Sequence, residues 1–100
     1  TDWKRIHFLY QLLYQLQPNP VVALNKAIAS AYAVGKEEAL DALMQIKGLE
    51  QHHLYHASIG ELLFELKNNA LAKKHFEKAL SLAPSLPEQS LLLSRVALCN

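Results

Sequence analysis

The sequence predicts an all-α fold of about six helices, arranged as antiparallel helical hairpins that stack on one another. Apolar residues recur every three or four positions along most of the chain, which is the period of a helix packed on one side. The four prolines fall between these segments, where they break helices. No stretch has the strict alternation of a half-buried strand, so no sheet is expected.

The first helix is expected over residues 2–17, with Asp2 as its cap. Its apolar positions are Trp3, Ile6, Leu9, Tyr10, Leu13 and Leu16. Pro18 and Pro20 end it, because neither ring can donate a backbone hydrogen bond and each disfavours helix in the residue before it.

The second helix is expected to start at Asn19-Pro20, a capping side chain followed by a ring suited to the first helical position. It should end at Gly35 as a left-handed stop. Apolar residues surround it almost completely, which predicts burial on several sides. The third helix is expected from Lys36 to Ile46, ending near Gly48.

Residues 53–86 predict the clearest hairpin of the chain. Its two helices are separated by a turn at Lys67-Asn68-Asn69, and Pro84 stops the second of them. A sixth helix is expected over residues 87–98, with Glu88 in its first turn, where the helix dipole favours an acid.

Small residues occupy regular places in this hairpin, at Gly60, Ala72 and Ala79, with Phe76 between the two alanines. Antiparallel helices approach closely only where side chains are small, and one aromatic ring fills the space beside them. Together with Pro84, these places match the tetratricopeptide (TPR) pattern. The sequence therefore predicts TPR-like packing, against the plainer alternative of any helical hairpin with an alanine-rich seam.

An earlier copy of the same pattern lies upstream at a constant offset, which is within one position of the TPR period. The matching pairs are Ala27 and Gly60, Ala39 and Ala72, and Leu43 and Phe76. We therefore expect one TPR-like domain over residues 1–100. Its repeats lie at about 20–49 and 53–86, and the flanking helices at 2–17 and 87–98 complete the stack.

Composition narrows the classes of function. Ten basic and nine acidic residues give a net charge of +1, which lacks the positive footprint that nucleic-acid binding ordinarily needs. The single cysteine, Cys99, cannot form an internal disulfide and fits a reducing compartment. No apolar run approaches the ~18 residues of a membrane span. The expectation is a cytoplasmic protein with no membrane partner.

Several phrases of the sequence go beyond a generic TPR. They are TDW at 1–3, PNPVVALNKAIA at 18–29, HHLYHA at 52–57 and HFEKALSLA at 75–83. Together they closely resemble the C-terminal, TPR-like extension of a subfamily of bacterial RNA polymerase sigma factors of the extracytoplasmic-function (ECF) type. The resemblance implies that regions upstream of Thr1 bind core RNA polymerase and promoter DNA. It also implies that this part contacts protein, either its own sigma regions or a regulator.

The chain departs from this resemblance at three places. Relatives often carry Arg where this chain has Ile59, a Gly-Arg turn where it has Lys67-Asn68, and two Arg where it has Gln89-Ser90. Contacts that depend on those arginines are not expected here.

No residue pattern predicts chemistry. His52 and His56 are four apart and share a helix face, as metal ligands can, but no third ligand has a suitable spacing. Capping and interhelical hydrogen bonds are the expected roles of His52, His53 and His56. The sequence predicts no catalytic residue, no cofactor, no metal site and no enzyme.

The expected function is an accessory, regulatory protein contact in a sigma factor that controls transcription initiation. The alternative is a free-standing TPR adaptor that binds a partner helix or peptide. The candidate contact surface, on the concave side of the stack, is Leu24, Ile28, Ala57, Glu61 and Phe64. That groove is either open or filled by the first helix through Trp3, Leu9 and Leu13; we expect the second, since an open apolar strip tends to aggregate.

Overall fold

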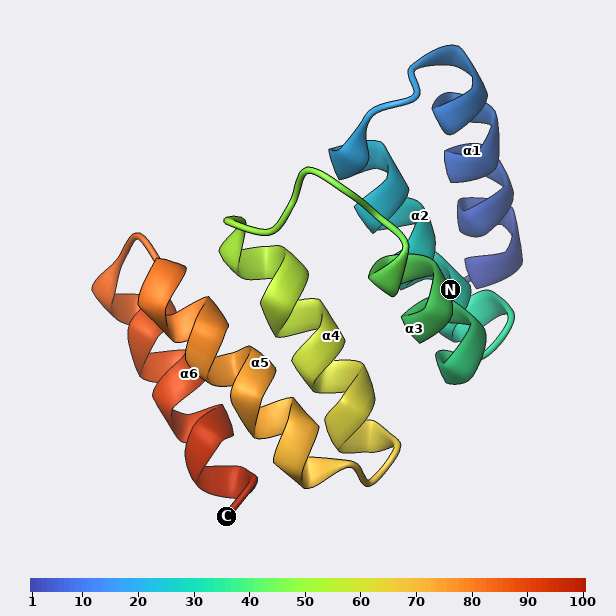
Figure 1. The fold of residues 1–100 in the computed structure, drawn as a ribbon. Coiled ribbons are helices and arrows are strands. Elements are labelled where there is room, and N and C mark those ends of the chain that lie inside the picture. The colour runs from blue at the N-terminus through green and yellow to red at the C-terminus, as the bar shows by residue number, and fades with distance from the viewer. The chain divides into compact units, whose positions relative to one another are not determined.

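The computed structural model describes residues 1–100 as six α-helices joined by short turns, with no strand (Figure 1). The predicted all-α, helical-hairpin fold is confirmed. The chain divides into two compact units of three helices each, which we call unit 1 (Thr1–Leu49) and unit 2 (Glu50–Asn100). None of the six helices combines the length and the apolar character that a membrane crossing requires.

Unit 1 contains α1 (Trp3–Leu16), α2 (Pro20–Ala33) and α3 (Lys36–Met44). The middle helix, α2, packs against both of the others. On one side, the ring of Trp3 stacks on the ring of Tyr32, with centroids 4.3 Å apart. Helix α2 is buried over much of its surface, as its apolar composition predicts.

The starts of α1 and α2 are capped by the residues expected from the sequence. The carboxylate of Asp2 accepts a hydrogen bond from the Arg5 N–H at 3.1 Å, and the Asn19 side chain accepts one from the Val22 N–H at 2.9 Å. Each bond satisfies a backbone donor that the first helical turn leaves without a partner. Pro20 occupies the first position of α2, where the missing N–H has no consequence.

The ends of α2 and α3 differ from expectation. Helix α2 ends at Ala33, and Gly35 is extended, with φ 167°, so the predicted left-handed stop at Gly35 is wrong. The turn closes instead because the N–H groups of Val34 and Gly35 both donate to the Ser30 carbonyl. Helix α3 ends at Met44, two residues before the predicted Ile46.

Unit 2 contains α4 (His53–Glu65), α5 (Asn69–Leu82) and α6 (Leu86–Leu98). Helix α5 packs against α4 and α6. The predicted start of α6 at residue 87 is one residue late, because the Ser85 hydroxyl caps the helix by accepting from the Glu88 N–H at 3.4 Å. Pro87 therefore lies inside the first turn, where its missing donor is not needed.

The small-residue seam of unit 2 is buried as predicted. Gly60 is buried, Ala72 and Ala79 are fully enclosed, and Phe76 is 1% exposed. Ile59 is also fully enclosed, and a charge could not be held at this position without a partner. The inward faces of α4 and α5 thus meet through the residues that the TPR pattern singles out.

Helix positions repeat along the chain at one constant interval. From α3 onward, the first residue of each helix lies a constant number of residues after the first residue of the helix two before it. The pairs of first residues are Trp3 and Lys36, Pro20 and His53, Lys36 and Asn69, and His53 and Leu86. Burial repeats as well, since Ala27, Ala39 and Leu43 are buried like their counterparts in unit 2. The grouping of residues 20–49 and 53–86 as repeats of one domain stays a prediction.

Candidate interaction surfaces

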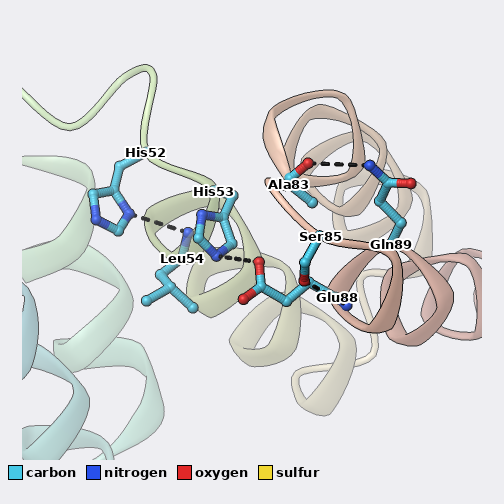
Figure 2. Close-up of polar contacts among 7 residues, drawn as sticks. All are labelled: His52, His53, Leu54, Ala83, Ser85, Glu88 and Gln89. Carbon is cyan, nitrogen blue, oxygen red and sulfur yellow. Dashed lines mark hydrogen bonds and ion pairs between the residues drawn. The ribbon is translucent and has the colours of Figure 1, made fainter.

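The histidines at the start of α4 hold the helix end in place. The Nδ1 atom of His52 accepts a hydrogen bond from the Leu54 N–H at 3.2 Å, so His52 is the cap of α4. The Nε2 atom of His53 lies 3.2 Å from Oε2 of Glu88, in the first turn of α6 (Figure 2). Beside them, the Gln89 amide donates to the Ala83 carbonyl at 3.2 Å. The His53–Glu88 contact therefore ties the start of α4 to the start of α6, and the Gln89–Ala83 bond ties α6 to the end of α5.

His56 makes a second set of contacts. Its Nε2 lies 2.8 Å from the Glu50 carbonyl oxygen, and its Nδ1 lies 3.5 Å from Nδ1 of His75 on α5. A carbonyl only accepts, so His56 must carry its proton on Nε2, and Nδ1 is then an acceptor for a proton on His75. Burial lowers the pKa of His75, and the neighbouring His56 lowers it further. Burial and the neighbouring ring therefore both favour the neutral form of His75.

The expected roles of the histidines, capping and interhelical hydrogen bonding, are confirmed by these contacts. His52 and His56 are not brought together, because His52 lies before the helix and its ring stacks on that of His53. No group of three or more His, Cys, Asp or Glu side chains is placed to hold a metal ion. Cys99 is 8% exposed and caps α6, so it has a fixed environment despite its place next to the last residue.

The residues of the predicted contact surface fall in both units. Leu24 is 3% exposed, so it belongs to the core and is not available to a partner, and Ile28 is half-buried. In unit 2, Ala57 and Phe64 are half-buried. Glu61 lies 2.7 Å from the Arg95 guanidinium of α6 and is engaged in that ion pair. The contact surface stays a prediction; within unit 1, the Leu24 side chain is buried on a helix that is packed on two sides.

A pocket of about 520 Å³ lies in unit 1, at the turn between α1 and α2 and beside the end of α3. Its walls combine apolar side chains with two amides and two lysines. They are formed by Tyr14, Pro18, Asn19, Pro20, Ala23, Lys26, Ala42, Gln45, Ile46 and Lys47. All of these residues are exposed or half-buried, so the pocket is shallow and suits a side chain of a partner better than an enclosed small molecule.

The pocket is positively charged. The Lys26 ammonium lies over the Tyr14 ring, 4.6 Å from its centroid, which holds this charge on the wall. Lys47 is exposed at the rim, no acidic side chain lines the pocket, and no acidic side chain of unit 1 pairs with either lysine. Sequence reasoning did not single out Lys26 or Lys47. The feature of the sequence that could have indicated this pocket is the PNPVVALNKA phrase, which supplies five of the wall residues.

Helix α1 also presents an exposed apolar surface, which we call the outer face. It consists of Phe8, Leu9, Leu12, Leu13 and Leu16. Trp3 packs against α2, but Leu9 and Leu13 are 52% and 36% exposed. Whether α1 fills the groove through these residues stays a prediction, and within unit 1 both Leu9 and Leu13 are exposed.

The sequence has a relative in Rhizobium meliloti (strain 1021), an uncharacterized protein that is 41% identical over 90 residues. The match covers 88% of this chain but 21% of the relative, so the chain spans about a fifth of that protein's length. No family model matches the chain. No solved structure matches it either.

Proposed function

We propose that residues 1–100 are an accessory, protein-contact part of a bacterial RNA polymerase sigma factor of the ECF type, and that they regulate transcription initiation by contact rather than by catalysis. The supporting resemblance lies in the phrases at 1–3, 18–29, 52–57 and 75–83. The much greater length of the Rhizobium meliloti relative is compatible with this role, because it leaves room for polymerase-binding and promoter-binding regions outside the shared stretch.

The observation that carries the proposal is the pocket at the α1–α2 turn. Its wall is built from the phrase that most specifically marks the resemblance, including Pro18, Asn19 and Pro20. Two lysines face an opening that no acid of unit 1 neutralises. A partner that inserts an acidic side chain would gain a charge-assisted contact there, while the apolar walls exclude water around it. The partner is one of the sigma regions or a separate regulator.

The test uses the full parent polypeptide with core RNA polymerase in a promoter-dependent transcription assay. The double variant Lys26→Glu, Lys47→Glu reverses the charge of the pocket and should change the transcript yield by about tenfold, as loss of a charged interface contact commonly does. The matched control is Lys74→Glu, an exposed lysine of α5, which should leave the yield unchanged. Circular dichroism should show the same helical content in all three proteins.

Two results would contradict the proposal. If the reading frame upstream of Thr1 encodes no polymerase-binding and promoter-binding regions, the sigma assignment is wrong. If the parent directs transcription and the pocket variant behaves like Lys74→Glu, the pocket is not the regulatory contact. A free-standing adaptor would instead bind a partner helix or peptide without any effect on polymerase.

A further inference from the structure

Helix α1 is apolar on two sides, although unit 1 covers only one of them. The rings of Trp3 and Tyr14 contact Tyr32 and Lys26 of α2, so this side is partnered. At 100° per residue, the outer face of Phe8, Leu9, Leu12, Leu13 and Leu16 spans an arc of about 140° that adjoins the partnered side. None of the residues of α1 is fully buried. A helix with apolar residues over more than half of its circumference is typical of a position between two partners.

Because helix starts recur at a constant interval, each position of α1 has an equivalent position in α3 and in α5. We call this correspondence the repeat register, and it shows that the outer face of α1 differs from the equivalent faces of those helices. Phe8 corresponds to Asp41 of α3 and Lys74 of α5, and both of these charged residues are exposed. Leu12 corresponds in the same way to Gln45 and Lys78, which are also exposed. Helix α5, and α3 together with its C-terminal cap residue Gln45, therefore present polar groups to water where α1 presents Phe8 and Leu12.

Two further positions of the outer face correspond to inward residues of α5. Leu9 corresponds to His75, which contacts His56 of the preceding helix α4, and Leu13 corresponds to Ala79, which is fully enclosed in unit 2. By the repeat register, Leu9 and Leu13 of α1 are placed to meet a helix that precedes α1.

We propose that the outer face is covered by a helix of the same polypeptide, N-terminal to Thr1, which packs on α1 as α4 packs on α5. The two hairpins are α2 with α3 and α4 with α5. In each of them the two helix starts are separated by the same number of residues, from Pro20 to Lys36 and from His53 to Asn69. The covering helix therefore begins about half a TPR period upstream of Trp3 and is amphipathic, with its apolar stripe on α1. The Rhizobium meliloti relative extends well beyond the shared stretch, which provides length for such a segment.

This inference goes beyond the proposed function and does not depend on it, because the covering helix is needed whatever the parent protein does. A second copy of the chain is the competing occupant. The two are distinguishable because coverage by a segment of the same polypeptide is independent of protein concentration, whereas dimerisation is not.

Thiol labelling of the parent polypeptide and of residues 1–100 tests the proposal. Both carry Cys99→Ala, so that the only probe in this region is a cysteine introduced at Leu12 on the outer face or at Gln11, an exposed polar position of α1. In the parent, Leu12→Cys should react with a maleimide at least about tenfold more slowly than Gln11→Cys, as expected for a packed site. In residues 1–100, the two rates should be similar. Phe8→Cys provides a second outer-face probe if Leu12→Cys perturbs the packing.

Equal labelling of the outer-face and Gln11 probes in the parent would overturn the proposal. Protection of Leu12→Cys in residues 1–100 that increases with protein concentration would assign the face to a second copy and would also overturn it. Polymerase is absent from this assay, so failure of the sigma assignment would leave the labelling result unchanged.

Discussion

The ring of Phe76 occupies the space beside Gly60. A methyl group at position 60 would lie 2.9 Å from two carbons of that ring, closer than side-chain carbons pack in proteins. The absence of a side chain at Gly60 is therefore what allows α4 to approach α5 at this point.

Replacing Gly60 with alanine should destabilise the protein, although alanine favours helix by about 1 kcal/mol over glycine. Overpacking against Phe76 should outweigh that gain, with a net loss of about 1–2 kcal/mol measured by urea unfolding. The matched control is Gly35→Ala, whose new methyl would meet only the flexible Glu38 carboxylate and whose backbone is extended. A Gly60→Ala protein as stable as the control would contradict this account.

Replacing the Phe76 ring with a smaller side chain should relieve the crowding at position 60. The double variant Gly60→Ala, Phe76→Leu should lose less stability than the two single losses added together, because Phe76→Leu leaves space that the alanine methyl group occupies. The coupling free energy from a double-mutant cycle should be about 1 kcal/mol in the compensating direction. Strict additivity would show that position 60 and the ring do not compete for the same space.

The turn between α4 and α5 offers a stabilising substitution. Lys67 has φ +70°, the left-handed region that a side chain disfavours by about 1 kcal/mol. Lys67→Gly should raise the free energy of unfolding by a few tenths to about 1 kcal/mol. Lys74→Gly, on the exposed side of α5, should lower it by about 1 kcal/mol. A fall in stability for Lys67→Gly would disprove the argument.

The His56–His75 contact predicts a pH dependence. Burial and the neighbouring His56 lower the pKa of His75 in the folded chain. The unfolded chain therefore binds the proton first as pH falls, so the contribution to stability is complete above about pH 6.5 and is lost as pH falls through the lowered folded pKa. The stability difference between wild type and His75→Gln should shrink, or change sign, from pH 8 to pH 5. A constant difference would contradict the prediction, and thermal unfolding at each pH measures it.

The Arg95–Glu61 ion pair should contribute little. Both side chains are 37% exposed, and such pairs typically add at most about 1 kcal/mol because water screens them and ordering costs entropy. A double-mutant cycle with Arg95→Ala and Glu61→Ala should give a coupling free energy below about 1 kcal/mol that falls further in 0.5 M salt. A coupling of several kcal/mol that persists in salt would show that the pair is effectively shielded.

The sequence anticipates features that depend on local sterics. Asn19-Pro20 locates a helix start, and Gly60, Ala72 and Ala79 locate a close helix contact, because each residue type has few other reasons to occupy such a place. Prediction from the sequence fails where the conformation of a residue depends on the groups that surround it in the folded chain. Gly35 is compatible with several backbone conformations, and the hydrogen bonds to Ser30 select an extended one.

The candidate surfaces were less predictable than the fold. Leu24 has the same apolar character whether it lines a groove or fills the core, and only the packing of α2 distinguishes the two. The pocket arises because the α1–α2 turn and the end of α3, which are separated along the chain by the whole of α2, lie together in unit 1. The apolar periodicity of a single helix does not predict that two segments distant in the sequence lie side by side.

The equal spacing of helix starts has a consequence for how proteins of this kind change over time. Because helix starts recur at one fixed interval, unequal recombination can duplicate or delete the codons of one whole interval. Such an event joins two equivalent helix positions, so the small residues and rings of every hairpin keep their relative spacing. Array length can therefore vary between descendants in whole steps, whereas an insertion of any other size within a hairpin would shift small residues away from the rings they accommodate.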